Sequence, residues 1–130
     1  MSSFSDYTEN LVLNYLLTTN SVTRPTAWYV GLFTAAPSDT GGGTEVSGSS
    51  YARVATGTIT VSGTATTATN SAAIEFAASS GSWGTIGWAA IFDASTAGNM
   101  LAWAPLTVSR TINSGDVFRI PAGSLTVTLT

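Results

Sequence analysis

The most continuous hydrophobic segment of the chain lies near residue 30. Residues 27–33 read AWYVGLF, an apolar and aromatic run typical of a strand that is buried on both faces. Residues 34–50 are nearly all small, polar or turn-forming, which indicates an exposed loop. Residues 51–66 alternate apolar positions with Thr and Ser, so they predict a half-exposed strand that bends at Gly57 or Gly63. We expect the later elements to pack against the first strand.

The rest of the chain consists of short strand-like segments separated by turn residues. No helical segment separates these strands, and their spacing of roughly 8–15 residues is typical of antiparallel folds. The sequence therefore predicts an all-β protein, an antiparallel β-sandwich of jelly-roll type. The last strand alternates cleanly, which places Leu125, Val127 and Leu129 inward. The expected strands cover residues 71–77, 83–92, 100–106 (ending near Pro105), 108–112, 117–120 and 125–130.

Residues 5–19 carry the single helix signal. Asp6 and Glu9 have the spacing of a capping box, and Asn20 is suited to a left-handed residue after the helix. We therefore divide the chain into an N-terminal helix or arm, residues 1–20, and one β-sandwich domain, residues 21–130. Two interpretations stay open: the helix packs on its own sandwich, or it is an arm that docks on a neighbouring subunit. Its apolar stripe is wide for covering a single edge, and it comprises Tyr7, Leu11, Val12, Leu13, Tyr15, Leu16 and Leu17.

The composition favours a protein that is packed into an assembly. Charged residues make up 8% of the chain, against about 25% in typical proteins, and Ser and Thr make up close to a third. Soluble proteins normally rely on surface charge, so we expect this chain to pack against copies of itself or a large complex. The net charge is −3, and the four arginines are scattered rather than arranged in a basic stripe. We therefore expect no nucleic-acid partner.

Most catalytic and metal chemistry is excluded by the residue inventory. The chain has no Cys, His or Lys, so disulfides, cysteine-zinc sites, the usual serine triad and Schiff bases are impossible. The loop between Asp39 and Glu45 has oxygen ligands suitable for calcium, but their spacing matches no known loop motif. We expect no enzyme activity, no cofactor and no metal. The N-terminus does not have the pattern of a signal peptide, and no apolar run approaches the ~20 residues that span a bilayer, so we expect no membrane partner.

Several segments together resemble a family of small bacteriophage virion proteins, whose members are labelled tail-fibre-like or head-decoration proteins. The resemblance begins with the strand WYVGLFT, the loop AAPSDTGGGTEVSG and the return SYARV. It continues through residues 68–106 and 112–129 and therefore covers nearly the whole chain, with the N-terminal helix the least diagnostic part. This resemblance implies a structural protein of the virion. The family has no catalytic residues, so none is transferred to this chain.

Eight residues are candidates for an assembly interface. The helix contributes Tyr7, Leu11 and Tyr15, and the glycine run offers a flexible loop tip that could mould itself to a neighbour. Trp28 and Trp88 lie in continuous apolar runs and are expected in the core, whereas Trp83 and Trp103 are expected to reach a surface or an interface. Core packing and a sugar-stacking platform of tryptophans are the alternatives. The candidates are Tyr7, Leu11, Tyr15, Gly41, Gly42, Gly43, Trp83 and Trp103.

The favoured function is that of a capsid decoration or cement protein on the exterior of a phage head. By analogy with decoration proteins, we expect a homotrimer that contacts the major capsid protein. One alternative is a tail-fibre or other appendage component, which would contact tail or neck proteins. Another is a carbohydrate-binding module that recognises host glycans.

Overall fold

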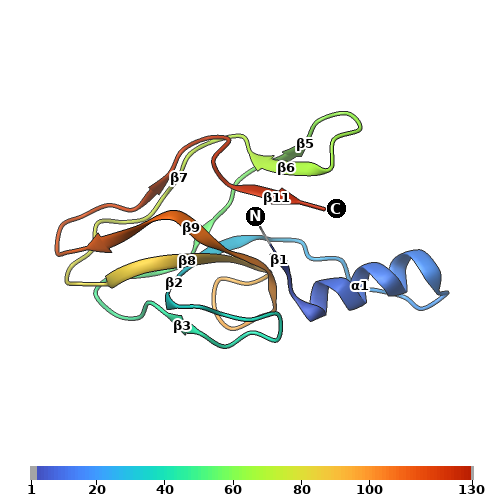
Figure 1. Cartoon of the computed structure of the whole chain (residues 1–130), viewed down its shortest axis with the longest axis horizontal. Coiled ribbons are helices and arrows are strands. Elements are labelled where there is room, and N and C mark those ends of the chain that lie inside the picture. The colour runs from blue at the N-terminus through green and yellow to red at the C-terminus, as the bar shows by residue number, and fades with distance from the viewer. Residues whose placement is uncertain (1–2, 130) are drawn as a thin grey trace.

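One helix, α1 (Asp6–Leu17), projects from a body of antiparallel strands in the computed structural model, which describes residues 3–129 (Figure 1). The predicted all-β fold with one N-terminal helix is therefore confirmed. The helix is capped by Ser5, not Asp6: the Ser5 hydroxyl accepts a hydrogen bond from the Thr8 amide at 3.2 Å. The residue after the helix, Thr18, is extended, and Asn20 is not in the left-handed conformation that we predicted for it.

The largest sheet is built around two long neighbouring strands, β8 and β9. The hydrophobic strand near residue 30, β2, pairs with β8 over five residue pairs, as expected for a strand at the centre of the fold. The strands lie in the order β1-β9-β8-β2-β3, and β4 also pairs with β2. Their bounds are β1 (Ser3–Phe4), β2 (Tyr29–Ala35), β3 (Thr44–Glu45), β4 (Val54–Ala55), β8 (Gly84–Phe92) and β9 (Met100–Ile112).

Two smaller sheets complete the β body. One has three strands in the order β11-β6-β5, and the other pairs β10 with β7. The sheets are open and layered as in a β-sandwich, but the jelly-roll connection that we predicted is not confirmed by this pairing. The bounds are β5 (Ile59–Val61), β6 (Thr67–Asn70), β7 (Ile74–Glu75), β10 (Arg119–Ile120) and β11 (Thr126–Thr128).

Three local predictions about the strands are wrong for physical reasons. Residues 51–66 do not form one strand, because Gly57 and Gly63 have φ of 66° and 53° and break it into β4, β5 and a turn. Pro105 does not end a strand: β9 continues through it, because β1 pairs with β9 at Trp103 and Ala102 and leaves that edge unpaired near the proline. Leu129 is 53% exposed rather than inward-facing.

The main core lies between the large sheet and the smaller strands. Aromatic rings form its centre: Phe76 meets Trp83 and Phe118 edge to face, with centroids 6.3 and 5.7 Å apart. The inward orientation of Ile74 and Phe76 is as predicted. The buried members are Val30, Leu32, Val46, Ile74, Phe76, Trp83, Ile86, Ile112 and Phe118.

A second apolar cluster covers the opposite face of the large sheet. It contains Phe33, Ala90, Phe92 and Met100, with Trp88 and Trp103 packed against it. The Arg53 guanidinium lies 3.5 Å from the centroid of the Phe92 ring and forms an ion pair with Glu45 at 2.8 Å. This arginine also donates to the carbonyls of Ala94 and Ala97, so it fixes the loop between β8 and β9 over the cluster.

Candidate assembly surface

The root of α1 is fixed to the β body by hydrogen bonds. Ser5 is 2% exposed, and its hydroxyl donates to the Met100 carbonyl at 2.5 Å. The Thr8 hydroxyl donates to the Leu101 carbonyl at 2.7 Å, and the Asp6 amide donates to the Asp39 carbonyl at 2.9 Å. The first turn is therefore held by both β9 and the loop after β2, so the direction of the helix is defined by its root.

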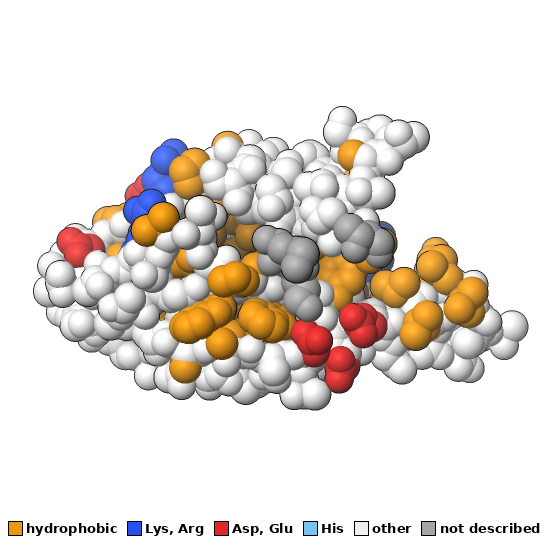
Figure 2. All heavy atoms as spheres, in the orientation of Figure 1, with side chains coloured by type: hydrophobic (Ala, Val, Ile, Leu, Met, Phe, Trp, Pro, Cys, Tyr) orange, Lys and Arg blue, Asp and Glu red, His pale blue; other side chains and the backbone are white. Residues whose placement is uncertain are grey.

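The outer part of α1 has little intramolecular cover. No residue of the helix is buried, and the elements that it mainly contacts are β1 and β9. In Figure 2 hydrophobic side chains gather over this projecting part, and acidic ones lie near its base. Leaving a Leu side chain in water forgoes about 1.5–3 kcal/mol relative to burial, so a stripe of this size is unfavourable in an isolated chain. The exposed fractions are 56% for Leu13, 70% for Tyr15, 67% for Leu16 and 76% for Leu17.

The helical candidates therefore differ in exposure. Tyr15 is among the most exposed large side chains, and Tyr7 is 40% exposed. Leu11 is half-buried and lines a cavity next to the helix root. Together these residues extend the apolar surface from the body onto the arm.

The glycine loop forms a hydrogen-bonded turn. Gly41, Gly42 and Gly43 all have positive φ, at 100°, 78° and 73°. The backbones of Ser38 and Gly41 exchange two hydrogen bonds, of 2.8 and 2.9 Å. A Cβ on Gly43 would lie 2.7 Å from the Pro37 nitrogen, so that position excludes any side chain, whereas Gly41 and Gly42 face open space. The sequence signal of three consecutive glycines reflects this geometry.

The two tryptophan candidates occupy different environments. Our prediction that Trp83 reaches the surface is wrong: it is 5% exposed, its indole donates to the Ser49 carbonyl at 3.0 Å, and it packs against Tyr51. Trp83 directly follows the turn at residues 79–82 and is already in the core. The polar residues of that turn do not indicate this burial. Trp103 is half-buried, and its indole donates to the Asp39 carboxylate at 3.0 Å, beside the helix root.

Trp28 and Trp88, predicted to be core residues, are both half-buried. Trp88 packs against the second apolar cluster, which contains Phe33 and Phe92, and Trp28 lines a cavity next to α1. The buried segment begins later than predicted, with Val30 at 0% exposure. The apolar residues next to Trp28 in the sequence do not indicate that the sheets lie apart near this side chain.

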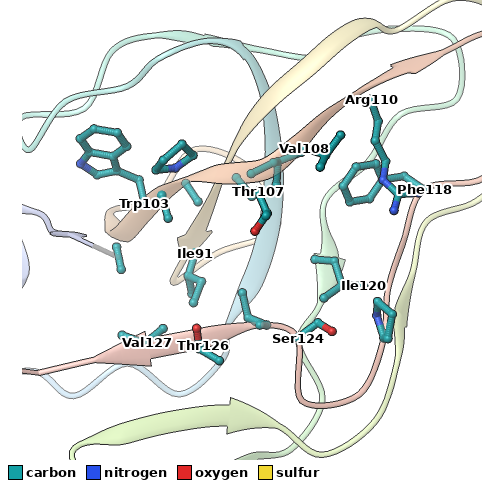
Figure 3. A pocket seen from close by; sticks show the side chains of 18 of the residues that line it. Ile91, Trp103, Thr107, Val108, Arg110, Phe118, Ile120, Ser124, Thr126 and Val127 are labelled. Carbon is teal, nitrogen blue, oxygen red and sulfur yellow. The ribbon is translucent and has the colours of Figure 1, made fainter. Parts of the chain in front are cut away.

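Two adjoining cavities, which the sequence analysis does not predict, open between the large sheet and the three-stranded sheet. The larger, of about 730 Å³, lies beside the helix root, and the smaller, of about 390 Å³, lies between β9 and the C-terminal segment. Figure 3 shows the smaller one: Ile91 points across open space toward β11, which carries Thr126 and Val127. Both cavities share the lining residues Ile91, Ala102, Leu125 and Val127. We call this combined space the inter-sheet groove.

The acidic side chains of the loops have structural partners. Glu45 binds Arg53 and accepts a hydrogen bond from the Tyr51 hydroxyl at 2.7 Å. Asp93 accepts from the amide of Asn99, and Asp116 accepts from the amide of Asn113. Burial, together with the neighbouring Glu45, raises the pKa of Tyr51. Among residues 3–129 there is no group of three or more acidic, His or Cys side chains that could hold a metal ion.

No helix in the described part of the chain is long and apolar enough to cross a membrane. Three features are candidate surfaces for contact: the projecting apolar arm, the inter-sheet groove and the glycine turn beside the arm's root.

Comparison with known families agrees with an assembly role. Residues 3–128 match the family described as podophage GP4 fiber I protein gp80. Because the match covers nearly the whole chain, the protein belongs to this family, and the resemblance to small phage virion proteins is confirmed. The chain is thus a bacteriophage virion structural protein. No curated protein matches the sequence.

Proposed function

We propose that the chain is a non-enzymatic component of a fibre or similar appendage of the phage virion, and that it self-associates through its N-terminal arm. The observation that carries the proposal is the projecting helix with four large apolar side chains more than half exposed, in a chain that matches a fibre family over residues 3–128. A free globular protein gains nothing from such an arm. A subunit of an assembly gains burial when a partner covers it.

The fixed root supports this proposal. The hydrogen bonds of Ser5 and Thr8 to β9 hold the arm in one direction relative to the body, so the arm presents its apolar stripe already ordered. Preorganisation reduces the conformational entropy that a partner must remove on binding. Charged residues make up only 8% of the chain, which is consistent with a surface that is largely covered by other protein in an assembly.

The position on the virion is tested by localisation and counting. A reconstruction of the native particle at sufficient resolution would place the chain, and quantitative mass spectrometry would give its copy number. We expect density on an appendage and a copy number far below that of the major capsid protein. Density over the capsid surface, with a copy number proportional to the capsid protein, would instead establish the decoration role.

Self-association is tested with the arm removed. We expect the full chain to sediment as an oligomer at micromolar concentration and a chain lacking residues 1–20 to sediment as a monomer with unchanged β-sheet circular dichroism. A full chain that stays monomeric would overturn the proposal. No observation favours the glycan-binding alternative, because Trp83 is buried and the Trp103 indole is engaged with Asp39.

A further inference from the structure

We propose that the exposed stripe of α1 in one copy lies in the inter-sheet groove of a second copy, and that two copies exchange their helices reciprocally. This inference rests on the proposed self-association and names the surfaces that carry it. It combines two unpartnered apolar features of one chain: the outer part of the helix and the groove beside its root.

The groove matches the stripe in polarity. Its walls include Leu11, Trp28, Ile91, Leu125 and Val127, side chains of the same character as the leucines of the arm. The volumes of about 730 and 390 Å³ lie near the range of about 300–1,000 Å³ that accommodates a drug-sized ligand. The groove can therefore receive several leucine-sized side chains while the helix itself lies across its mouth.

The charges of helix and groove are complementary. Three of the four arginines of the chain, Arg24, Arg110 and Arg119, line the two cavities, and no acidic residue is among the described residues that line them. The helix carries acidic residues in its first turn and no basic residue in its last turn. Its C-terminal carbonyls bear partial negative charge and favour a nearby cation. The end of a partner's arm at the helix root would lie near Arg24, which lines the larger cavity there.

The location of the groove favours a reciprocal pair. The larger cavity is lined by Thr8 and Leu11 of the chain's own helix, so a second helix in the groove would lie beside the first. In a two-fold arrangement the two helices run antiparallel, and the tip of each reaches the root of the other. A 12-residue helix is about 18 Å long, which is enough for this overlap.

The buried area also favours reciprocity. A leucine-sized side chain removes about 100 Å² from water when it is covered, so the exposed stripe offers about 250–300 Å². If the groove contributes a similar area, a reciprocal pair buries about 500–600 Å² on each chain. This is close to the lower limit of about 600 Å² per partner for specific interfaces. A one-way contact would bury only about half as much.

Cysteine cross-linking tests this arrangement cleanly, because the chain contains no cysteine of its own. One preparation carries Leu16→Cys on the exposed stripe, and another carries Thr58→Cys, an exposed residue that lines the groove. After mixing and mild oxidation, we expect a covalent heterodimer, identified by mass. Each chain has one cysteine, so this product requires the arm of one copy to reach the groove of another.

The control replaces Thr58→Cys with Ser114→Cys, an exposed position in the turn beyond the far end of β9. We expect at least a tenfold lower heterodimer yield from this pair, with circular dichroism confirming that all variants are folded. Equal yields from the two pairs, or no heterodimer with Thr58→Cys, would overturn the exchange. If the unmodified chain still sediments as an oligomer, the proposed self-association stands and the helix-in-groove contact fails. A monomer would overturn both, and a mass other than twice 13.3 kDa would overturn the two-fold pairing.

Discussion

The two ends of the β body differ in how closely its layers meet. At one end Phe76, Trp83 and Phe118 fill the space between the layers, and each is at most 5% exposed. At the other end the layers separate around the inter-sheet groove. The large sheet carries bulky side chains such as Ile86 at the closed end, but Ala89, Ala102 and Ala104 face the groove. The small side chains of these alanines contribute to the open space at this end.

This difference has a consequence for assembly. A sandwich that closed at both ends would present only its polar edges to a partner. Here the open end adjoins the root of α1, so the unfilled space and the unpartnered helix lie at the same end of the molecule (Figure 1). The closed end supplies the stability that allows the other end to stay open.

The largest effect is expected at the closed end, for Phe76→Ala. The ring is 2% exposed and contacts three other aromatic rings, so the variant loses burial and leaves a cavity. We expect the free energy of unfolding to fall by about 3–5 kcal/mol. Urea denaturation followed by tryptophan fluorescence measures this change. The matched variant at the open end is Leu125→Ala. We expect it to lower the free energy of unfolding by less than about 2 kcal/mol, because the Leu125 side chain is only half-buried and less burial is lost. Equal losses would contradict the comparison.

The next effect is expected on the face opposite the core, for Arg53→Ala. The Arg53 side chain is 9% exposed and Glu45 is 24% exposed, so removing the guanidinium leaves a poorly solvated carboxylate without its cation. It also uncovers Phe92 and frees two loop carbonyls. We expect a loss of about 3 kcal/mol in the free energy of unfolding.

Arg119→Ala is the matched control for this arginine. Its ion pair with Glu75 is longer, at 3.7 Å, and both side chains are more than half exposed. Thermal and urea denaturation of the two variants should differ clearly, with Arg119→Ala changing stability by less than about 0.5 kcal/mol. A large loss at Arg119 would mean that the groove rim is stabilised by charge, contrary to the view that it is built to receive a partner.

The sequence predicted the centre of this fold better than its ends. Uninterrupted apolar patterns located β2 and β8 correctly, because burial on both faces leaves a strong local signal. The long β9 was predicted as two strands, since the tolerance of Pro105 depends on an unpaired edge that local sequence does not reveal. Trp83 was misplaced for a similar reason: its burial depends on Ser49 and Tyr51, which are distant in sequence.

The candidate site was predictable only in part. The wide stripe of α1 correctly indicated more apolar surface than the body covers, because helical periodicity is a local property. The glycine run predicted a flexible loop tip, but not that Gly43 packs against the backbone at Pro37. The inter-sheet groove was not predictable, since it results from small side chains on strands that face a layer distant in sequence.

A smaller effect is expected for Tyr51→Phe, which links the core to the Arg53 network. The hydroxyl accepts from the Leu32 amide at 2.9 Å and donates to Glu45 at 2.7 Å, so its removal leaves a buried amide without a partner. We expect a loss of about 1–3 kcal/mol near neutral pH.

The pH dependence gives Tyr51→Phe a distinctive signature. Burial raises the pKa of Tyr51 above its ordinary value of 10.0, so the folded state holds the proton more tightly than the unfolded state. This contribution to stability is complete below pH 10 and is lost as the pH rises above it. Wild-type stability should therefore fall above pH 10, and Tyr51→Phe should flatten that fall. Tyr15→Phe, at an exposed position, is the control and should keep the wild-type slope.

The smallest effect on stability is expected for Ala104→Leu, which fills part of the open end. Ala104 is half-buried and lines the smaller cavity, so the added side chain has room and gains burial. We expect the free energy of unfolding to stay within about 1 kcal/mol of wild type, whereas Ile86→Phe, at a position of 0% exposure at the closed end, should cost about 1–3 kcal/mol through overpacking. Because the leucine occupies space that a partner's arm would use, Ala104→Leu should also weaken self-association in sedimentation. If it destabilises the chain as much as Ile86→Phe does, the layers are as tightly packed at Ala104 as at Ile86, and the open end described above does not exist in solution.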